Sequence, residues 1–246
     1  MTNGPEDHKR ILYGRRRGHK LRPGQQELVN NLLPHLLVSL PDEGMMNPAD
    51  QFEIEPDTRT ANDSPGNAFW LEVGFGGGEH LAAQAEANPD VSIFGCEPFE
   101  NGVASLLAHI ENKGLRNVRI HNDDARDLIA ALPEASIDRA FLLFPDPWPK
   151  SRHAKRRFVS AENLTSLARV LTDDAEFRVA TDHVSYCRWA LSQLLKHPDF
   201  SWQAECASDW RVRSADWPPT RYEQKALDQG RKPVYFKFRR KMRESN

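Results

Sequence analysis

Strand-length apolar runs alternate with helix-length segments along most of the chain, and this alternation is the feature that most restricts its fold. The runs with the length and composition of a strand occupy residues 69–73, 91–96, 118–121, 137–144, 176–180, 201–205 and 234–239. Strands that alternate with helices are typical of parallel β-α-β units. We therefore expect an α/β fold, in which a doubly wound, mostly parallel sheet carries helices on both faces.

Shifts in composition divide the chain into three parts. Residues 1–24 are polar and basic, and we expect them to form a flexible arm. Residues 25–67 combine a helical apolar stripe, which Pro34 should break or kink, with an acidic, proline-rich insertion at 41–66. Residues 68–246 hold the expected strands and should form the main domain.

The overall composition, 39% hydrophobic and 28% charged, is ordinary for a globular domain. No apolar run approaches the roughly 20 residues that cross a bilayer, and no secretory signal is visible, so we expect a cytoplasmic protein without membrane contact. Three cysteines, Cys96, Cys187 and Cys206, lack paired spacing. They predict reduced thiols and no metal site.

Positive charge is concentrated in two short clusters, although the net charge is only −2. One cluster lies between Arg15 and Arg22, and the other places five Lys and Arg side chains between Lys150 and Arg157. Because local fields steer a ligand at close range, these clusters predict contact with a polyanion such as RNA. The alternative is that the second cluster is only a solvated helix face.

Acidic residues recur at or near the carboxyl ends of the first five expected strands, at Glu72, Glu97, Asp124, Asp146 and Asp182. Parallel sheets bind their ligands outside the carboxyl ends of the strands. Carboxylates gathered on one rim repel one another unless each meets a donor or a cation. The pattern therefore predicts a binding rim, although loop tips also favour Asp and Glu in general.

A glycine-rich turn follows the first strand at residues 72–78, with the sequence E-V-G-F-G-G-G. Glycines allow a tight turn and a close approach of ligand to backbone, and the next helix offers free N–H groups. A dinucleotide would require a third glycine after Gly74 and Gly76, but Glu79 stands there and would oppose a pyrophosphate. The turn instead resembles the first motif of S-adenosylmethionine-dependent methyltransferases, although a plain turn is the simpler alternative.

Two of the acids suit a nucleoside at this turn. Glu97 ends the second strand, where a carboxylate can accept hydrogen bonds from ribose hydroxyls. Asp124 follows the third strand and could face the exocyclic amine of an adenine. We assign no chemical task to the neighbouring His80 and Cys96.

The loop after the fourth strand, residues 144–150, reads F-P-D-P-W-P-K and runs into the second basic cluster. Prolines on both sides of Asp146 limit the freedom of the loop and suit a carboxylate that must stay aimed. Trp148 could stack on a flat base or could support the loop, and the sequence leaves both open. This block resembles the bacterial tRNA (guanine-N7-)-methyltransferase family, as do the segments 14–20, 180–182 and 219–223.

The resemblance covers most of the chain outside 41–66, and it implies a Rossmann-like class I methyltransferase fold with a seven-stranded sheet. It implies S-adenosylmethionine as cofactor, tRNA as partner, and N7 of the guanine at variable-loop position 46 as the methylated atom. The implied cofactor-binding residues are Glu72, Gly74, Gly76, Glu97 and Asp124. The implied catalytic residue is Asp146. The implied contacts to the target nucleotide are Asp146, Lys150, Asp182, Thr220, Arg221, Tyr222 and Glu223. The implied RNA-backbone contacts are Arg152, His153, Lys155, Arg156 and Arg157.

Guanine chemistry limits the role of Asp146. Guanine N7 carries a lone pair and no proton, so its methylation requires no general base. We expect Asp146 to orient the guanine through its N1–H and N2–H edge and to stabilise the arriving positive charge.

Three rival functions remain open at the level of sequence. A dinucleotide-dependent oxidoreductase would share the fold, but the missing third glycine and the acidic rim argue against it. A methyltransferase for exocyclic amines would more typically carry two prolines and an aromatic residue after its Asn or Asp. An RNA-binding protein with a decayed site would not be expected to keep the acids at the strand ends. The sequence is compatible with a monomer or a homodimer.

Overall fold

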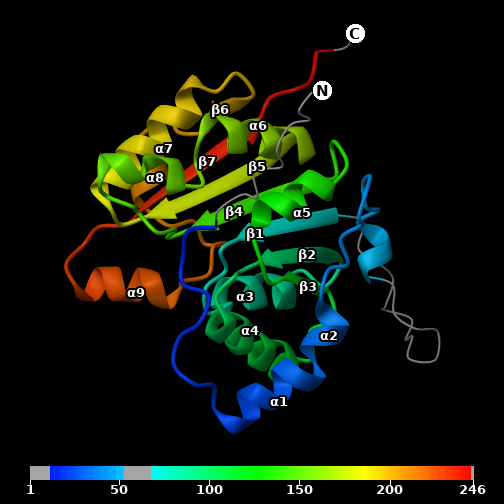
Figure 1. The fold of residues 1–246 in the computed structure, drawn as a ribbon. Coiled ribbons are helices and arrows are strands. Elements are labelled where there is room, and N and C mark those ends of the chain that lie inside the picture. Colours follow the sequence, from blue (N-terminus) through cyan, green and yellow to red (C-terminus); the bar gives the residue numbers. More distant parts are fainter. Residues whose placement is uncertain (1–11, 53–67, 245–246) are drawn as a thin grey trace, which may run out of the picture.

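The computed structural model describes residues 12–52 and 68–244 (Figure 1). The start of the expected arm and most of the acidic insertion, residues 1–11 and 53–67, lie outside the described residues.

One sheet with the strand order β3-β2-β1-β4-β5-β7-β6 forms the centre of the molecule. Its strands are β1 (Ala68–Val73), β2 (Val91–Cys96), β3 (Val118–His121), β4 (Ile137–Leu143), β5 (Leu171–Thr181), β6 (Phe200–Trp202) and β7 (Val234–Arg240). Strands β1 to β5 are parallel, and β7 runs antiparallel to both of its neighbours. The expected seven-stranded, mostly parallel sheet is thus confirmed. The chain order reverses between β1 and β4, which is where such sheets open a crevice for ligands.

Helices cover both faces of the sheet (Figure 1). One face carries α1 (Pro23–Asn31), α2 (Leu33–Leu36), α3 (Glu79–Ala87) and α4 (Glu100–Lys113), and the other carries α5 (Ala125–Ala131), α6 (Ala161–Val170) and α7 (Val184–Lys196). Two apolar cores result, one between each helical layer and the sheet, with Leu81 and Leu106 in the first and Leu128 and Leu164 in the second. None of the helices in the described ranges is long and apolar enough to cross a membrane.

Local signals set the helix ends much as the sequence predicts. Gly114 ends α4 with a φ of +63°, a conformation that glycine adopts without strain. The break near Pro34 is confirmed, because α1 ends at Asn31 and Pro34 lies in the first turn of α2. The strand expected over 201–205 stops at Trp202 instead. The N–H groups of Glu205 and Cys206 donate to Asp209, so the chain turns into the short helix α8 (Ser208–Arg211).

The C-terminal part returns to the rim of the sheet through α9 (Arg221–Asp228), which projects from one end of the molecule (Figure 1). Two short 3₁₀ helices, η1 (Ala49–Phe52) and η3 (Ser151–Arg156), complete the described elements. Segments before β1, after β4 and after β6 therefore meet at the carboxyl ends of the parallel strands.

Candidate active site

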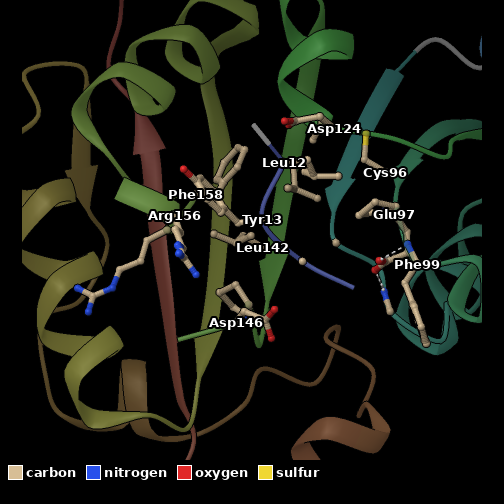
Figure 2. A pocket seen from close by; sticks show the side chains of 18 of the residues that line it. Leu12, Tyr13, Cys96, Glu97, Phe99, Asp124, Leu142, Asp146, Arg156 and Phe158 are labelled. Atoms are coloured by element: carbon tan, nitrogen blue, oxygen red, sulfur yellow. Dashed lines mark hydrogen bonds between the residues drawn. The ribbon is translucent and has the colours of Figure 1, made fainter. Parts of the chain in front are cut away.

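A cavity of about 700 Å³ opens outside the carboxyl ends of β1, β2 and β4 (Figure 2). Its wall is formed by the glycine turn, the loop after β2, the start of α5, the loop after β4 and residues 12–15 of the arm. This volume suits a nucleoside-sized ligand. In the view of Figure 2, Asp124 and Asp146 lie at opposite ends of the cavity, with Tyr13 of the arm between them.

The glycine turn forms the floor of the cavity with backbone that only glycine adopts easily. Gly74 and Gly76 have φ angles of +71° and +58°. A Cβ added at Gly76 would lie 2.8 Å from the ring of Tyr222, so the glycine also allows α9 to approach the turn. The two glycines that sequence reasoning assigned to the cofactor therefore both lie on the cavity wall.

Glu97 lies on the cavity wall and is fixed by two backbone donors. Its oxygens accept hydrogen bonds from the N–H of Gly76 at 2.8 Å and of Phe99 at 3.0 Å (Figure 2). Burial raises the pKa of this carboxyl, and the two backbone hydrogen bonds partly oppose that shift. Each oxygen keeps a lone pair for a further donor, as the expected contact to ribose hydroxyls requires.

Asp124 also faces the cavity, but it is engaged by its own helix. It caps α5 by accepting from the N–H of Arg126 at 3.0 Å, and the Arg126 guanidinium bonds both of its oxygens. Sequence reasoning missed this arginine, although a cation two residues after a cap is a visible signal. Any adenine amine that binds here would share Asp124 with Arg126.

Glu72, expected from the sequence to contact the cofactor, lies behind the wall of the cavity. The side chain is buried, 2% exposed, and is absent from the residues that line the cavity. Its Oε2 lies 2.7 Å from Nδ1 of His80, which is 1% exposed on α3. His80, to which we assigned no chemical task from the sequence, is therefore the partner of Glu72.

The loop after β4 holds Asp146 at the edge of the cavity in a strained conformation. Phe144 and Trp148 have φ angles of +50° and +41°, which are costly for side chains with a Cβ and cluster at functional sites. Arg157 holds the loop, because its Nη2 donates to the Trp148 carbonyl at 2.9 Å and its Nε to the Pro147 carbonyl at 3.2 Å. Asp146 itself is exposed.

Trp148 packs within an aromatic cluster beside the cavity. Its ring meets Tyr13 of the arm with centroids 6.5 Å apart, and His153 with centroids 5.8 Å apart, both edge to face. The Arg156 guanidinium lies over both Tyr13, at 4.5 Å, and Trp148, at 4.8 Å. Of the two roles left open for Trp148, this packing favours support of the loop over stacking on a base.

The arm runs from this cluster across the cavity toward α4. The Arg16 carbonyl accepts from the N–H of Glu100 at 2.9 Å, and the Arg16 side chain pairs with Asp123 at 2.6 Å. Gly18 donates its N–H to Asn101 at 2.9 Å. That the arm is flexible stays a prediction. Tyr13, which the sequence analysis did not single out, is one of the residues that line the cavity.

The basic cluster after the loop separates into surface and interior side chains. Lys150, Arg152 and Lys155 are exposed, whereas Arg157 is 7% exposed and stacks on Trp189 at 4.9 Å. The structure therefore places Arg157 beneath the loop, mostly buried and on the wall of the cavity. Partial desolvation, followed by the charge of Arg156, lowers the pKa of His153.

The residues expected to hold the target nucleotide also divide. Thr220 caps α9 by accepting from the N–H of Glu223 at 3.1 Å, and Glu223 is buried against the Tyr235 hydroxyl at 2.6 Å. Arg221 pairs with Glu79 at 3.4 Å, and Tyr222, 42% exposed, lines the cavity.

Asp182, at the end of β5, pairs with Arg231 at 3.0 Å. Its carboxylate is thus neutralised by a cation from the segment that links α9 to β7.

Comparisons with known proteins agree with this geometry. A family model described as "Putative methyltransferase" matches residues 67–236. A protein from Ruegeria sp. named tRNA (guanine-N(7)-)-methyltransferase is 50% identical over 231 residues, which cover 94% of this chain and 88% of that protein. One of the same name from Rhodospirillum rubrum is 44% identical over 246 residues, covering 100% of this chain and 93% of that protein.

Among solved structures, a 16S rRNA (adenine(1408)-N(1))-methyltransferase from Catenulisporales acidiphilia superposes with a TM-score of 0.50 at 13% identity. The match covers 78% of this chain and 95% of that chain. At this identity the likeness concerns the fold, and it confirms the Rossmann-like arrangement expected from the alternating strands and helices.

Proposed function

We propose that this chain, which belongs to the tRNA (guanine-N(7)-)-methyltransferase family, transfers the methyl group of S-adenosylmethionine to N7 of a guanine in tRNA. We place that guanine at position 46, in the variable loop, and the enzyme in the cytoplasm. The observation that carries the proposal is the single cavity that joins the glycine turn to Asp146, in a chain with such relatives over nearly its whole length.

The cavity residues fit the cofactor. The positive-φ glycines leave the floor of the cavity open, and the fixed carboxylate of Glu97 can accept two ribose hydroxyls. Asp124 supports the adenine end of the cavity. When bound, S-adenosylmethionine supplies an electrophilic methyl group on a cationic sulfur.

Asp146 acts by orientation and charge. The methyl group would be accepted by the lone pair of guanine N7, and the guanine would carry the positive charge after the transfer. No proton leaves N7, so the carboxylate accepts the N1–H and N2–H of guanine and stabilises the new cation. The paired acids Glu72, Asp124 and Asp182 hold other parts of the rim in place.

The surface beside the cavity suits the RNA backbone. Lys150, Arg152 and Lys155 expose their charges along η3 and the residue before it, so phosphates can approach without displacing packed side chains. Tyr222 lies at the cavity edge, where a base can meet its ring.

The test is incubation with labelled S-adenosylmethionine and unmodified tRNA, followed by nucleoside analysis. We expect 7-methylguanosine, lost when a tRNA with another base at position 46 is supplied. Asp146→Asn should lose most of kcat while its Kd for tRNA stays close to that of the wild type. Formation of a different methylated nucleoside, or full turnover by Asp146→Asn, would refute the proposal.

A further inference from the structure

A chain of buried polar side chains runs behind the glycine turn, from β1 into the interior face of α3. A carboxylate only accepts, so His80 Nδ1 donates to Glu72 at 2.7 Å, and His80 Nε2 can accept from Nε2 of Gln84 at 3.3 Å. The second hydrogen of the Gln84 amide then donates to the Asp216 carbonyl at 2.9 Å. One helix thereby joins the strand beneath the cofactor turn to a segment more than a hundred residues later.

That segment, residues 213–223, ends in the first turn of α9. Its Asp216 carboxylate pairs with the buried Arg178 of β5 at 2.6 Å, and Trp217 is fully buried. Arg213 bonds the Trp217 carbonyl and pairs with Glu223 of α9 at 3.0 Å. The orientation of the first turn of α9 therefore depends on bonds made behind the turn.

The first turn of α9 contacts the glycine turn at the cavity. Tyr222, in that first turn of α9, lies against Gly76, so closely that a Cβ there would come within 2.8 Å of its ring. Arg221 reaches Glu79, the first residue of α3, at 3.4 Å. The series of bonded side chains thus begins at Glu72, beside the glycine turn, and ends at Tyr222, which packs against that turn.

We infer that His80 and Gln84 are positioning residues, which act through the 213–223 segment to hold Tyr222 against the glycine turn for the target nucleotide. This inference rests on the proposed function and assigns no contact to substrate for either residue. Apolar side chains could fill the same space on α3, as Leu81, Ala82 and Ala85 do beside them. Polar groups are expensive to bury unless each one is bonded, so a bonded series that ends at the cavity indicates a geometric task.

The test is a double-mutant cycle between Gln84→Met and Tyr222→Ala, measured as kcat/KM for tRNA. Gln84→Met removes the donor to Asp216 and keeps an unbranched side chain of similar length. We expect KM for tRNA to rise about tenfold, as the loss of one buried hydrogen bond allows, with the Kd for S-adenosylmethionine unchanged. In the Tyr222→Ala background the same substitution should have no further effect.

Glu86→Met serves as the matched control, because Glu86 lies on the exposed side of α3 and pairs with Lys113. It should leave KM unchanged. If Gln84→Met is too unstable to assay, Gln84→Glu keeps the size of the side chain while lacking the donor N–H. Hydrogen exchange gives a second readout, in which Gln84→Met should speed exchange in 213–223 relative to the strands of the sheet.

Additive effects in the cycle, or a loss of cofactor affinity equal to the loss of tRNA use, would overturn the inference while the wild type still forms 7-methylguanosine. A wild type that forms no 7-methylguanosine would instead refute the proposed function, and the positioning role with it.

Discussion

Arg157 should stabilise the loop that carries Asp146 and contribute nothing to RNA affinity, which Arg157→Ala can test. Its guanidinium makes two hydrogen bonds to loop carbonyls, at 2.9 and 3.2 Å, and stacks on Trp189. Hydrogen bonds from a charged donor contribute about 1.5–3 kcal/mol each. We expect the free energy of unfolding to fall by about 3 kcal/mol, which lowers Tm by roughly 6–12 °C in a chain of this length.

The same substitution should lower kcat. Phe144 and Trp148 hold unfavourable backbone angles that cost on the order of 1–3 kcal/mol each, and they persist only while the surroundings enforce them. Without Arg157 the loop can relax, and Asp146, which lies between Phe144 and Trp148, is no longer held in one orientation. Affinity for tRNA and its dependence on salt should stay close to those of the wild type, because Arg157 is mostly buried and its guanidinium is engaged by the loop carbonyls and Trp189.

Arg152→Ala is the matched control, since Arg152 belongs to the same basic cluster but is exposed. Its effect on the free energy of unfolding should stay within about 0.5 kcal/mol. The slope of log K against log salt should instead flatten by roughly one unit if the side chain meets one phosphate. Thermal unfolding and tRNA binding over a salt series measure both quantities. An Arg157→Ala protein with wild-type Tm and a flattened salt slope would refute the reasoning.

Two further predictions concern the cavity wall. Burial raises the pKa of Glu97, so the stability that its protonated form contributes is full below the unfolded pKa and is lost as pH rises through the raised value. Urea unfolding should show that the free energy of unfolding of Glu97→Gln rises relative to that of the wild type as pH rises through that window. A difference between the two proteins that does not change with pH would contradict this. Gly76→Ala and Gly74→Ala should each cost about 1–2 kcal/mol of stability, because both positions have positive φ. Only Gly76→Ala should also raise KM for tRNA, since its Cβ would displace Tyr222, and equal KM values would argue against that contact.

The fold could be predicted from the sequence because periodicity and local signals agree. Strand-length apolar runs, helix stops such as Gly114 and the break near Pro34 depend on neighbouring residues, and the alternation of strands with helices predicts a mostly parallel sheet. The site could be predicted as a region for a similar reason. Carboxyl ends of parallel strands meet at one edge, so residues such as Glu97 and Asp146 had to lie near one cavity.

The direction of individual side chains could not be predicted in this way. Arg156 and Arg157 are adjacent and identical in type, yet one lies over Tyr13 and Trp148 while the other turns beneath the loop. Arg156 is the last residue of η3 and Arg157 follows it in extended conformation, and a run of cations carries no signal for where that helix ends. His80 likewise becomes meaningful only when α3 packs on β1 and brings its ring to Glu72.

The five acids at the carboxyl ends of the strands differ in their partners, and this difference affects where negative charge is available. Glu72 meets His80, Asp124 meets Arg126 and Asp182 meets Arg231, while Glu97 accepts two backbone N–H groups. Within residues 12–52 and 68–244, Asp146 is the one of the five acids whose carboxylate has no hydrogen-bond or ion-pair partner. A carboxylate with an arginine partner, as Asp124 and Asp182 have, adds little field, and an unpaired one adds its full charge. The loop whose strained backbone positions Asp146 therefore also places an unpaired carboxylate at the edge of the cavity, where a methylated guanine would become cationic.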